Sequence, residues 1–137
     1  MPDVFLQDTS FWILANRRRG PEDARARFRE LLATGQLAIN EMVRLEILLG
    51  YKTRDDVSLI SDELESLRLL PTSRDVWNGA ERLGFDLQRA GVRSLIPDLV
   101  IAATAIHHNA TLLHADSDFE RIAQHSDLRT ESHLDSP

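Results

Sequence analysis

Four acidic side chains occupy positions where an acid is unusual, and together they have the chemistry of a divalent-cation site. Asp8 and Asp116 each stand two residues after a short apolar run, at 4–6 and 111–114. Glu46 has apolar neighbours at helical spacing, and Asp98 opens an almost wholly apolar segment. Taken singly, the aspartates can be plain helix caps, and Glu46 can pair with an arginine. Taken together, four acids on four separate elements would crowd one pocket, where they repel each other.

That repulsion indicates a hard cation. Two carboxylates about 4 Å apart repel by roughly 4 kcal/mol at an effective dielectric constant of 20. Mg²⁺ prefers oxygen ligands and removes this cost, and Mn²⁺ can substitute for it. Zinc is disfavoured, because the chain has no cysteine and the adjacent His107 and His108 diverge on a helix. The sequence therefore predicts a Mg²⁺ site built from carboxylates.

Further residues near these acids have two interpretations each. Asp118 either shares the site of Asp116 or caps the helix that follows it. His114 ends a strand and either touches substrate or fills space. The run 17–19 consists of three arginines and is either a solvated surface segment or a rim that contacts phosphates. Two tryptophans, Trp12 and Trp77, stand at apolar helical positions, so we expect core packing and not base stacking. Trp12 is close enough to Asp8 that stacking on a base stays an alternative for it.

Short apolar runs alternate with helical patterns along the chain. Strands are expected at 4–6, 36–39, 68–71, 111–114 and 128–130. Helices are expected at 11–15, 21–34, 41–49, 55–67, from 73 or 75 to about 90, 98–107 and 119–124. This alternation predicts an α/β fold with a parallel sheet covered by helices on both faces. In such sheets ligands bind beyond the carboxyl ends of the strands, where Asp8 and Asp116 stand.

Composition narrows the class of protein. A chain of 137 residues indicates one domain, expected at 1–131, followed by a loose polar tail at 132–137. The absence of cysteine excludes disulfide frameworks and cysteine nucleophiles. No apolar run reaches about 18 residues and no signal peptide is recognisable, so we expect no membrane segment and a cytoplasmic protein.

The net charge of −6 argues against a non-specific binder of polyanions. Of the 16 basic residues, however, only Lys52 is a lysine, and the other 15 are arginines. Arginine binds carboxylates and phosphates with two parallel hydrogen bonds. Local arginines around an acidic centre could therefore still hold a phosphate chain.

Four segments in order carry a resemblance to a known family. They are Asp8-Thr9-Ser10, the helix 44–50 (RLEILLG), the segment 97–105 (PDLVIAATA) and the segment 112–119 (LLHADSDF). Together they cover nearly the whole chain. The pattern resembles the PIN-domain ribonucleases, and within them it is most similar to the VapC toxins of type II toxin–antitoxin modules.

The resemblance implies a three-layer α/β/α sandwich with a five-stranded parallel sheet. It implies an endoribonuclease that hydrolyses RNA phosphodiester bonds with a metal-activated water. It also implies a homodimer and a cognate VapB antitoxin that blocks the active site, often with a basic side chain. The family's catalytic and metal-binding acids match Asp8, Glu46, Asp98 and Asp116. Asp118 matches a frequent further acid, Thr9 and Ser10 match small hydroxyl residues, and His114 stands where many relatives have Thr or Ser.

Two alternatives remain at this point. A receiver-like signalling domain also gathers acids beyond strand ends and binds Mg²⁺, but it needs a lysine late in the chain, and Lys52 lies in a helical connection. A PIN-type fold retained only for protein binding would have no reason to keep acids at all four positions.

Overall fold

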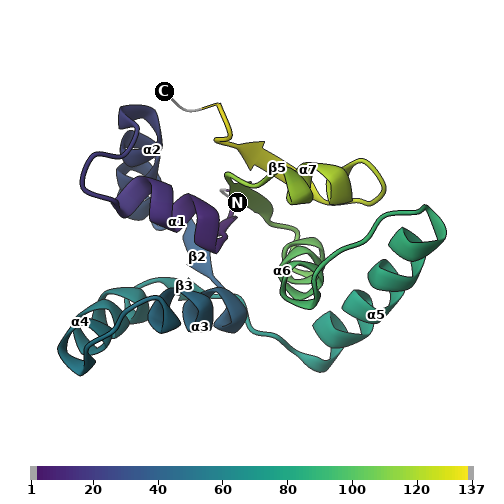
Figure 1. Ribbon diagram of the computed structural model, residues 1–137, viewed down its shortest axis with the longest axis horizontal. Helices are drawn as coiled ribbons and strands as arrows, with labels where there is room; N and C mark the ends of the chain where they lie inside the picture. The colour runs from purple at the N-terminus through teal and green to yellow at the C-terminus, as the bar shows by residue number, and fades with distance from the viewer. Residues whose placement is uncertain (1–2, 136–137) are drawn as a thin grey trace.

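Five parallel strands form a single sheet in the computed structural model, which describes residues 3–135 (Figure 1). The strands are β1 (Phe5–Gln7), β2 (Leu37–Ile39), β3 (Arg68–Leu69), β4 (Thr111–His114) and β5 (Arg129–Ser132). Their order across the sheet is β3-β2-β1-β4-β5, and every neighbouring pair is parallel. The five-stranded parallel sheet is therefore confirmed. Receiver-like sheets have the order 2-1-3-4-5, so the receiver-like alternative is wrong.

Seven helices within the described residues connect and cover these strands. They are α1 (Thr9–Asn16), α2 (Glu22–Ala33), α3 (Glu41–Leu49), α4 (Arg54–Glu65), α5 (Arg74–Arg89), α6 (Ile96–His107) and α7 (Ser117–Ala123). Each expected helix is present, and the ends differ by one or two residues. The largest functional consequence is at α6 and α7, which both begin two residues earlier than expected. Proline is tolerated in a first helical turn, so Pro97 lies inside α6 instead of before it.

Alternate side chains of the strands face two separate layers of helices. Phe5 of β1, Leu37 of β2 and Leu113 of β4 pack in one apolar cluster with α1 and α2. The next residues in register, Leu6 and Leu112, pack in a second and larger cluster with α3, α5, α6 and α7. This period of two follows from the pleat of a strand. The α/β/α sandwich is thereby confirmed: α2 and part of α1 cover one face of the sheet, and α3, α5 and α6 lie over the other (Figure 1).

The central strands β1 and β4 bring two acids to the same edge of the sheet. Gln7 is in register with Leu113, so both strands reach their carboxyl ends at the same level. The next backbone N–H, that of Asp8, still donates to the carbonyl of Leu113 at 3.0 Å. Asp8 and Asp116 therefore begin α1 and α7 side by side, as the spacing of the apolar runs predicts.

Three expectations about the periphery need correction or completion. Trp12 is buried as expected, but Trp77 is 47% exposed on α5, because it lies outside the small cluster that buries Val76. Glu131, the last residue of the expected domain, accepts two hydrogen bonds from Arg27, at 3.0 and 2.8 Å. The expected tail at 132–137 begins inside β5, and its last two residues lie outside the described part of the chain. Over residues 3–135, every helix is too short or too polar to cross a membrane.

Candidate active site

Three carboxylates meet at the carboxyl edge of the sheet. Asp98, Asp116 and Asp118 each offer an oxygen, and these oxygens lie within 4.8 Å of one another. Asp98 lies in the first turn of α6, while Asp116 is the N-cap of α7 and Asp118 lies in its first turn. The starts of α6 and α7 thus bring three aspartate side chains together. We call these three residues the acid cluster.

The backbone of α7 fixes how its two acids are presented. The Asp116 carboxylate accepts the N–H of Asp118 at 2.9 Å, so Asp116 is the cap of the helix. The interpretation of Asp118 as the cap is wrong, because the helix starts at Ser117 and not at Phe119. The Asp118 carboxylate is therefore available to the acid cluster, and its Oδ1 also pairs with Arg121 at 3.4 Å.

The charges of the cluster oppose each other strongly. The pKa of Asp98 is raised to about 6, first because the side chain is partly buried and then because Asp116, Asp118 and Glu46 are nearby. Such a shift is the expected result of like charges in a poorly hydrated place. A divalent cation relieves it, and an all-oxygen donor set fits Mg²⁺ or Mn²⁺ better than zinc. The donors present therefore suit the metal that the sequence predicts.

Asp8 lies beside this cluster and not within it. The residue is 3% exposed, and burial raises its pKa to about 6, with the charge of Asp116 adding to the effect. Its two oxygens accept the Ser10 hydroxyl at 2.8 and 2.7 Å, and Oδ1 also accepts the N–H of Phe11 at 3.0 Å. Asp8 is thus the cap of α1 and an electrostatic neighbour of Asp116 at the same time.

Glu46 has a hydroxyl partner in place of an arginine. The Thr9 hydroxyl donates to its Oε1 at 2.9 Å. Within residues 3–135 no ion pair involves Glu46, and Arg44 instead donates to the hydroxyl of Ser61 at 2.6 Å. The alternative of a structural ion pair at Glu46 is therefore wrong. Like Asp8, Glu46 lies outside the acid cluster, but its charge contributes to the raised pKa of Asp98.

The two hydroxyl residues after Asp8 tie the site together. Thr9 links the start of α1 to α3 through Glu46. Besides donating to Asp8, the Ser10 oxygen accepts the backbone N–H of Ala115 at 2.9 Å. That contact joins the chain after β1 to the chain after β4. Removing either hydroxyl is expected to loosen the spacing between Asp8, Glu46 and the acid cluster.

His114 supports Asp116 from below and has no exposed surface. Its Nδ1 accepts the N–H of Asp116 at 3.1 Å, and its Nε2 lies 2.7 Å from a carboxylate oxygen of Glu120. An acceptor Nδ1 requires the neutral ring with the proton on Nε2. Burial lowers the pKa of His114, which favours that neutral form. Contact with substrate is thereby ruled out, and the filling of space is confirmed.

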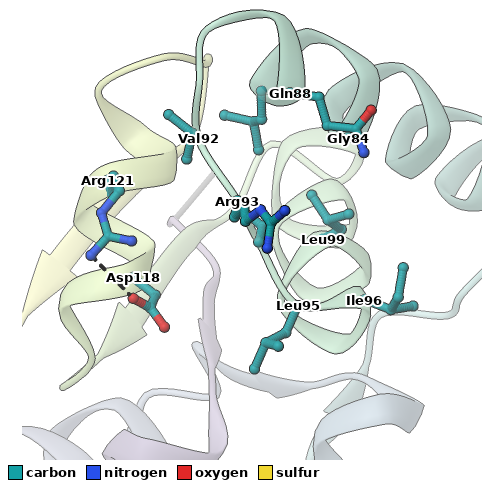
Figure 2. A pocket seen from close by; sticks show the side chains of 11 residues that line it. Gly84, Gln88, Val92, Arg93, Leu95, Ile96, Leu99, Asp118 and Arg121 are labelled. Atoms are coloured by element: carbon teal, nitrogen blue, oxygen red, sulfur yellow. Dashed lines mark ion pairs between the residues drawn. The ribbon is translucent and has the colours of Figure 1, made fainter.

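Two cavities of different chemistry flank the acids. One of about 320 Å³ lies beside Thr9 and Glu46 and is lined by Trp12 and Tyr51. The other, of about 610 Å³, lies beside Asp118 and includes two arginines, Arg93 and Arg121 (Figure 2). Sequence reasoning did not single out these two arginines, because nothing in their local pattern distinguishes them from the other exposed ones. The arginines at 17–19 are exposed and line a surface hollow, and Arg17 also lines the 320 Å³ cavity.

Comparison with known proteins places the chain in a family. The family model described as "PIN domain" matches residues 5–124. The chain is 37% identical to Ribonuclease VapC18 of Mycobacterium tuberculosis over an alignment of 124 residues, and the alignment covers 88% of each chain. It is 32% identical to Ribonuclease VapC11 of the same species over 139 residues, with 94% of this chain and 98% of the relative covered. The chain therefore belongs to the PIN-domain family, and within it to the VapC group.

Solved structures agree on the fold. The VapBC2 structure from Rickettsia felis, bound to a promoter DNA fragment, matches with a TM-score of 0.78 at 22% identity over 94% of this chain and 98% of that one. FitAcB from Neisseria gonorrhoeae matches with a TM-score of 0.77 at 20% identity over 93% and 96%. Both likenesses establish the three-layer architecture independently of the sequence match.

Proposed function

We propose that this protein is a metal-dependent endoribonuclease and the toxin of a VapBC-type toxin–antitoxin module. The observation that carries the proposal is the acid cluster, in which three carboxylate oxygens lie within 4.8 Å of one another at the edge of the sheet. Membership of the VapC group supports RNA as the substrate, because the relatives are named ribonucleases. A PIN fold kept only for protein binding would gain nothing from concentrating negative charge in this way.

Asp98, Asp116 and Asp118 are the residues that would hold Mg²⁺ or Mn²⁺, with Asp8 reinforcing the negative field beside Asp116. A divalent ion bound there activates water and neutralises charge on a phosphodiester undergoing hydrolysis. Glu46 lies outside the acid cluster and would act as the general base that accepts the proton of the attacking water. Thr9 holds one oxygen of Glu46, and Ser10 holds Asp8, so both hydroxyls position acids and do not react.

The surface next to the site supports an antitoxin partner. Apolar side chains are exposed on α1 and α3. Ile13, which lines the 320 Å³ cavity, is 51% exposed, and Leu45 and Leu49, which are sequence neighbours of the cavity residues Glu46 and Gly50, are 54% and 75% exposed. An apolar segment of a VapB protein that covers them would end beside Glu46 and the acid cluster. A basic side chain delivered there would be attracted by the acids and would block the entry of RNA.

A second apolar surface supports a homodimer. Trp77 and Phe85, both on α5, are exposed by 47% and 59%. Exposed apolar side chains gathered in this way are typical of interaction surfaces. In Figure 1, α5 lies on the far side of α6 from α1, so an antitoxin on α1 and a second copy on α5 could bind together.

A cleavage assay tests the proposed function. Purified protein incubated with a mixture of structured RNAs should cut them in Mg²⁺ or Mn²⁺ and leave them intact in EDTA. Asp98→Asn should abolish cutting, because the change removes one charge from the acid cluster at nearly constant volume. Asp62→Asn, a matched change on the exposed face of α4, should cut normally. Equal cutting by wild type and Asp98→Asn would remove the proposal.

A further inference from the structure

The 610 Å³ cavity borders the acid cluster at one residue, Asp118. It lies between the end of α5, the loop at 91–95, the start of α6 and helix α7 (Figure 2). Asp118 belongs both to the wall of this cavity and to the acid cluster. A strand that passes Asp118 on this side of the acid cluster would therefore meet the cavity. Its apolar walls, Leu95, Ile96 and Leu99, lie opposite the polar side chains of α7 (Figure 2).

Arg93 is an uncommitted cation held at the mouth of this cavity. The loop that carries it is fixed by the end of α5: Gly91 adopts a φ of +78°, and the N–H of Val92 donates to the carbonyl of Leu87 at 2.8 Å. The Val92 side chain is buried, so the backbone at Arg93 is anchored although its side chain is exposed. Among residues 3–135, no hydrogen bond or ion pair engages the Arg93 guanidinium.

Arg121 supplies a second cation from the opposite wall. Its Nη2 lies 3.4 Å from Oδ1 of Asp118, and the two side chains are 51% and 45% exposed. An exposed pair of this kind contributes little free energy, so the guanidinium can exchange Asp118 for another anion. Two arginines therefore face one cavity next to three acids, in a chain whose net charge is −6. Arginine at such a place matches the geometry of a phosphate.

We propose that this cavity binds a backbone phosphate of the substrate RNA, one step along the strand from the bond that is cut, through Arg93 and Arg121. The inference rests on the proposed ribonuclease function and names a subsite for it. The scissile phosphate occupies the acid cluster, and the strand continues past Asp118 into the cavity. The two arginines thus fix the register of the strand and attract it, while the acid cluster performs the chemistry.

Binding of a short fluorescein-labelled single-stranded RNA tests the subsite. Fluorescence anisotropy is measured in Ca²⁺, with a gel to verify that the strand stays intact. Arg93→Ala should weaken binding about tenfold and reduce the slope of log K against log salt by about 0.7, the value for one lost phosphate contact on a single strand. Arg93→Lys should retain part of the affinity. Arg82→Ala removes the same charge from an exposed site on α5 outside the cavity and should bind as wild type does.

Steady-state cleavage gives an independent readout. A residue that only positions the strand should raise KM about tenfold in Arg93→Ala and change kcat less than about twofold. Arg121→Ala should also raise KM. This variant is less specific than Arg93→Ala, because it also removes the ion-pair partner of Asp118.

Several outcomes would overturn the subsite. One is an affinity and salt slope of Arg93→Ala that equal those of Arg82→Ala. Another is a change in oligomeric state of Arg93→Ala by sedimentation, which would make Arg93 a contact between two copies. A third is an Arg93→Ala variant that binds RNA normally but no longer binds the antitoxin, which would mean that the cavity holds an acidic protein segment. If one of these outcomes is found and the wild type still cuts RNA, only the subsite is wrong and the proposed ribonuclease function stands. If the wild type neither binds nor cuts RNA, the subsite and the ribonuclease function both fail.

Discussion

Thr9 and Glu46 are joined by a hydrogen bond of 2.9 Å between the Thr9 hydroxyl and Oε1 of Glu46, across 37 positions of the chain. The bond connects the residue that follows Asp8 with the middle of α3. It also explains how a carboxylate on a largely apolar helix face keeps a polar partner without an arginine. One oxygen of Glu46 is thus fixed, and its charge is held near enough to Asp98 to raise the pKa of that residue.

Thr9→Val should therefore lower kcat about tenfold with little change in KM, because Glu46 loses its orientation while the strand still binds. The fold should lose about 1 kcal/mol of stability, the usual contribution of one such hydrogen bond. Steady-state cleavage and urea unfolding measure the two effects. Thr9→Ser should restore most of kcat. Thr34→Val, at the end of α2, is the matched control, and a kcat of Thr9→Val equal to that of the control would contradict the assignment.

Asp98→Asn should stabilise the metal-free protein while it abolishes cleavage. A carboxyl whose pKa is raised from 3.8 to about 6 binds its proton more tightly in the folded state, so its ionisation destabilises the fold above pH 6. Asparagine removes that penalty. The gain near neutral pH should be about 1 kcal/mol, since solvent screening at a half-buried carboxylate reduces the effect. It should disappear as the pH falls toward 3.8, where Asp98 is protonated.

Thermal unfolding in EDTA, at neutral and at acidic pH, measures this difference. Added Mn²⁺ provides the converse experiment, because an ion that binds only the folded state stabilises it by about 2.7 kcal/mol at a hundred times its Kd. Wild type and Asp62→Asn should show the increase, and Asp98→Asn should show much less. Identical increases in all three proteins would mean that the ion binds elsewhere.

The inner strands β1, β2 and β4 could be predicted because each is a short, mostly apolar and buried run. The edge strand β5 is polar, and it extends two residues beyond the expected end at 130. The sequence also identified Asp8 and Asp116, since the carboxyl ends of neighbouring parallel strands meet at one edge of the sheet. It left Asp118 open, because a shift of two residues in the start of α7 decides whether this residue caps the helix or joins the acid cluster. Helix ends depend on the competition between adjacent capping side chains, which a periodic pattern does not resolve.

The relation of Thr9 to Glu46 and the place of Arg93 lay beyond the reach of sequence reasoning. The first depends on how α3 packs on the sheet next to α1, a tertiary contact that leaves no local pattern. The second depends on a loop whose path is set by the left-handed Gly91 and the buried Val92. The exposure of Trp77 has a similar origin, because apolar spacing cannot tell a core face from a surface that another chain would cover.

His114 should make the protein sensitive to mild acid. Burial lowers its pKa from 6.5, so the stability of the neutral ring is fully present above pH 6.5 and is lost as the pH falls below that value. Protonation of Nδ1 would set its new N–H against the N–H of Asp116. Asp8 and Asp98 act in the opposite direction, because their raised pKa values favour the folded state at low pH. The contribution of His114 must therefore be isolated by comparison with a variant.

His114→Gln keeps a donor for Glu120 but cannot be protonated. Urea midpoints measured between about pH 7 and pH 5 should fall more steeply for the wild type than for this variant, although the variant starts about 1 to 2 kcal/mol less stable. His125→Gln, on the exposed side of the protein after α7, should follow the wild type. Parallel curves for the wild type and His114→Gln would exclude the buried neutral ring.

Gln7→Met should stabilise the protein. Gln7 ends β1 directly before Asp8, is fully buried, and has no hydrogen-bond partner for either amide atom within residues 3–135. Leaving a buried polar group unpaired costs about 1 to 3 kcal/mol, and a methionine of similar length avoids that cost. We expect a gain of about 1 kcal/mol in urea unfolding, with kcat changed less than about twofold, because the backbone that positions Asp8 is unaltered. Gln36→Met removes hydrogen bonds to Thr34 and to the carbonyl of Asp3, so it should give no gain. A loss of stability in Gln7→Met as large as that in Gln36→Met would show that the Gln7 amide is hydrogen-bonded in solution, and that the end of β1 is held by a polar contact next to the acids.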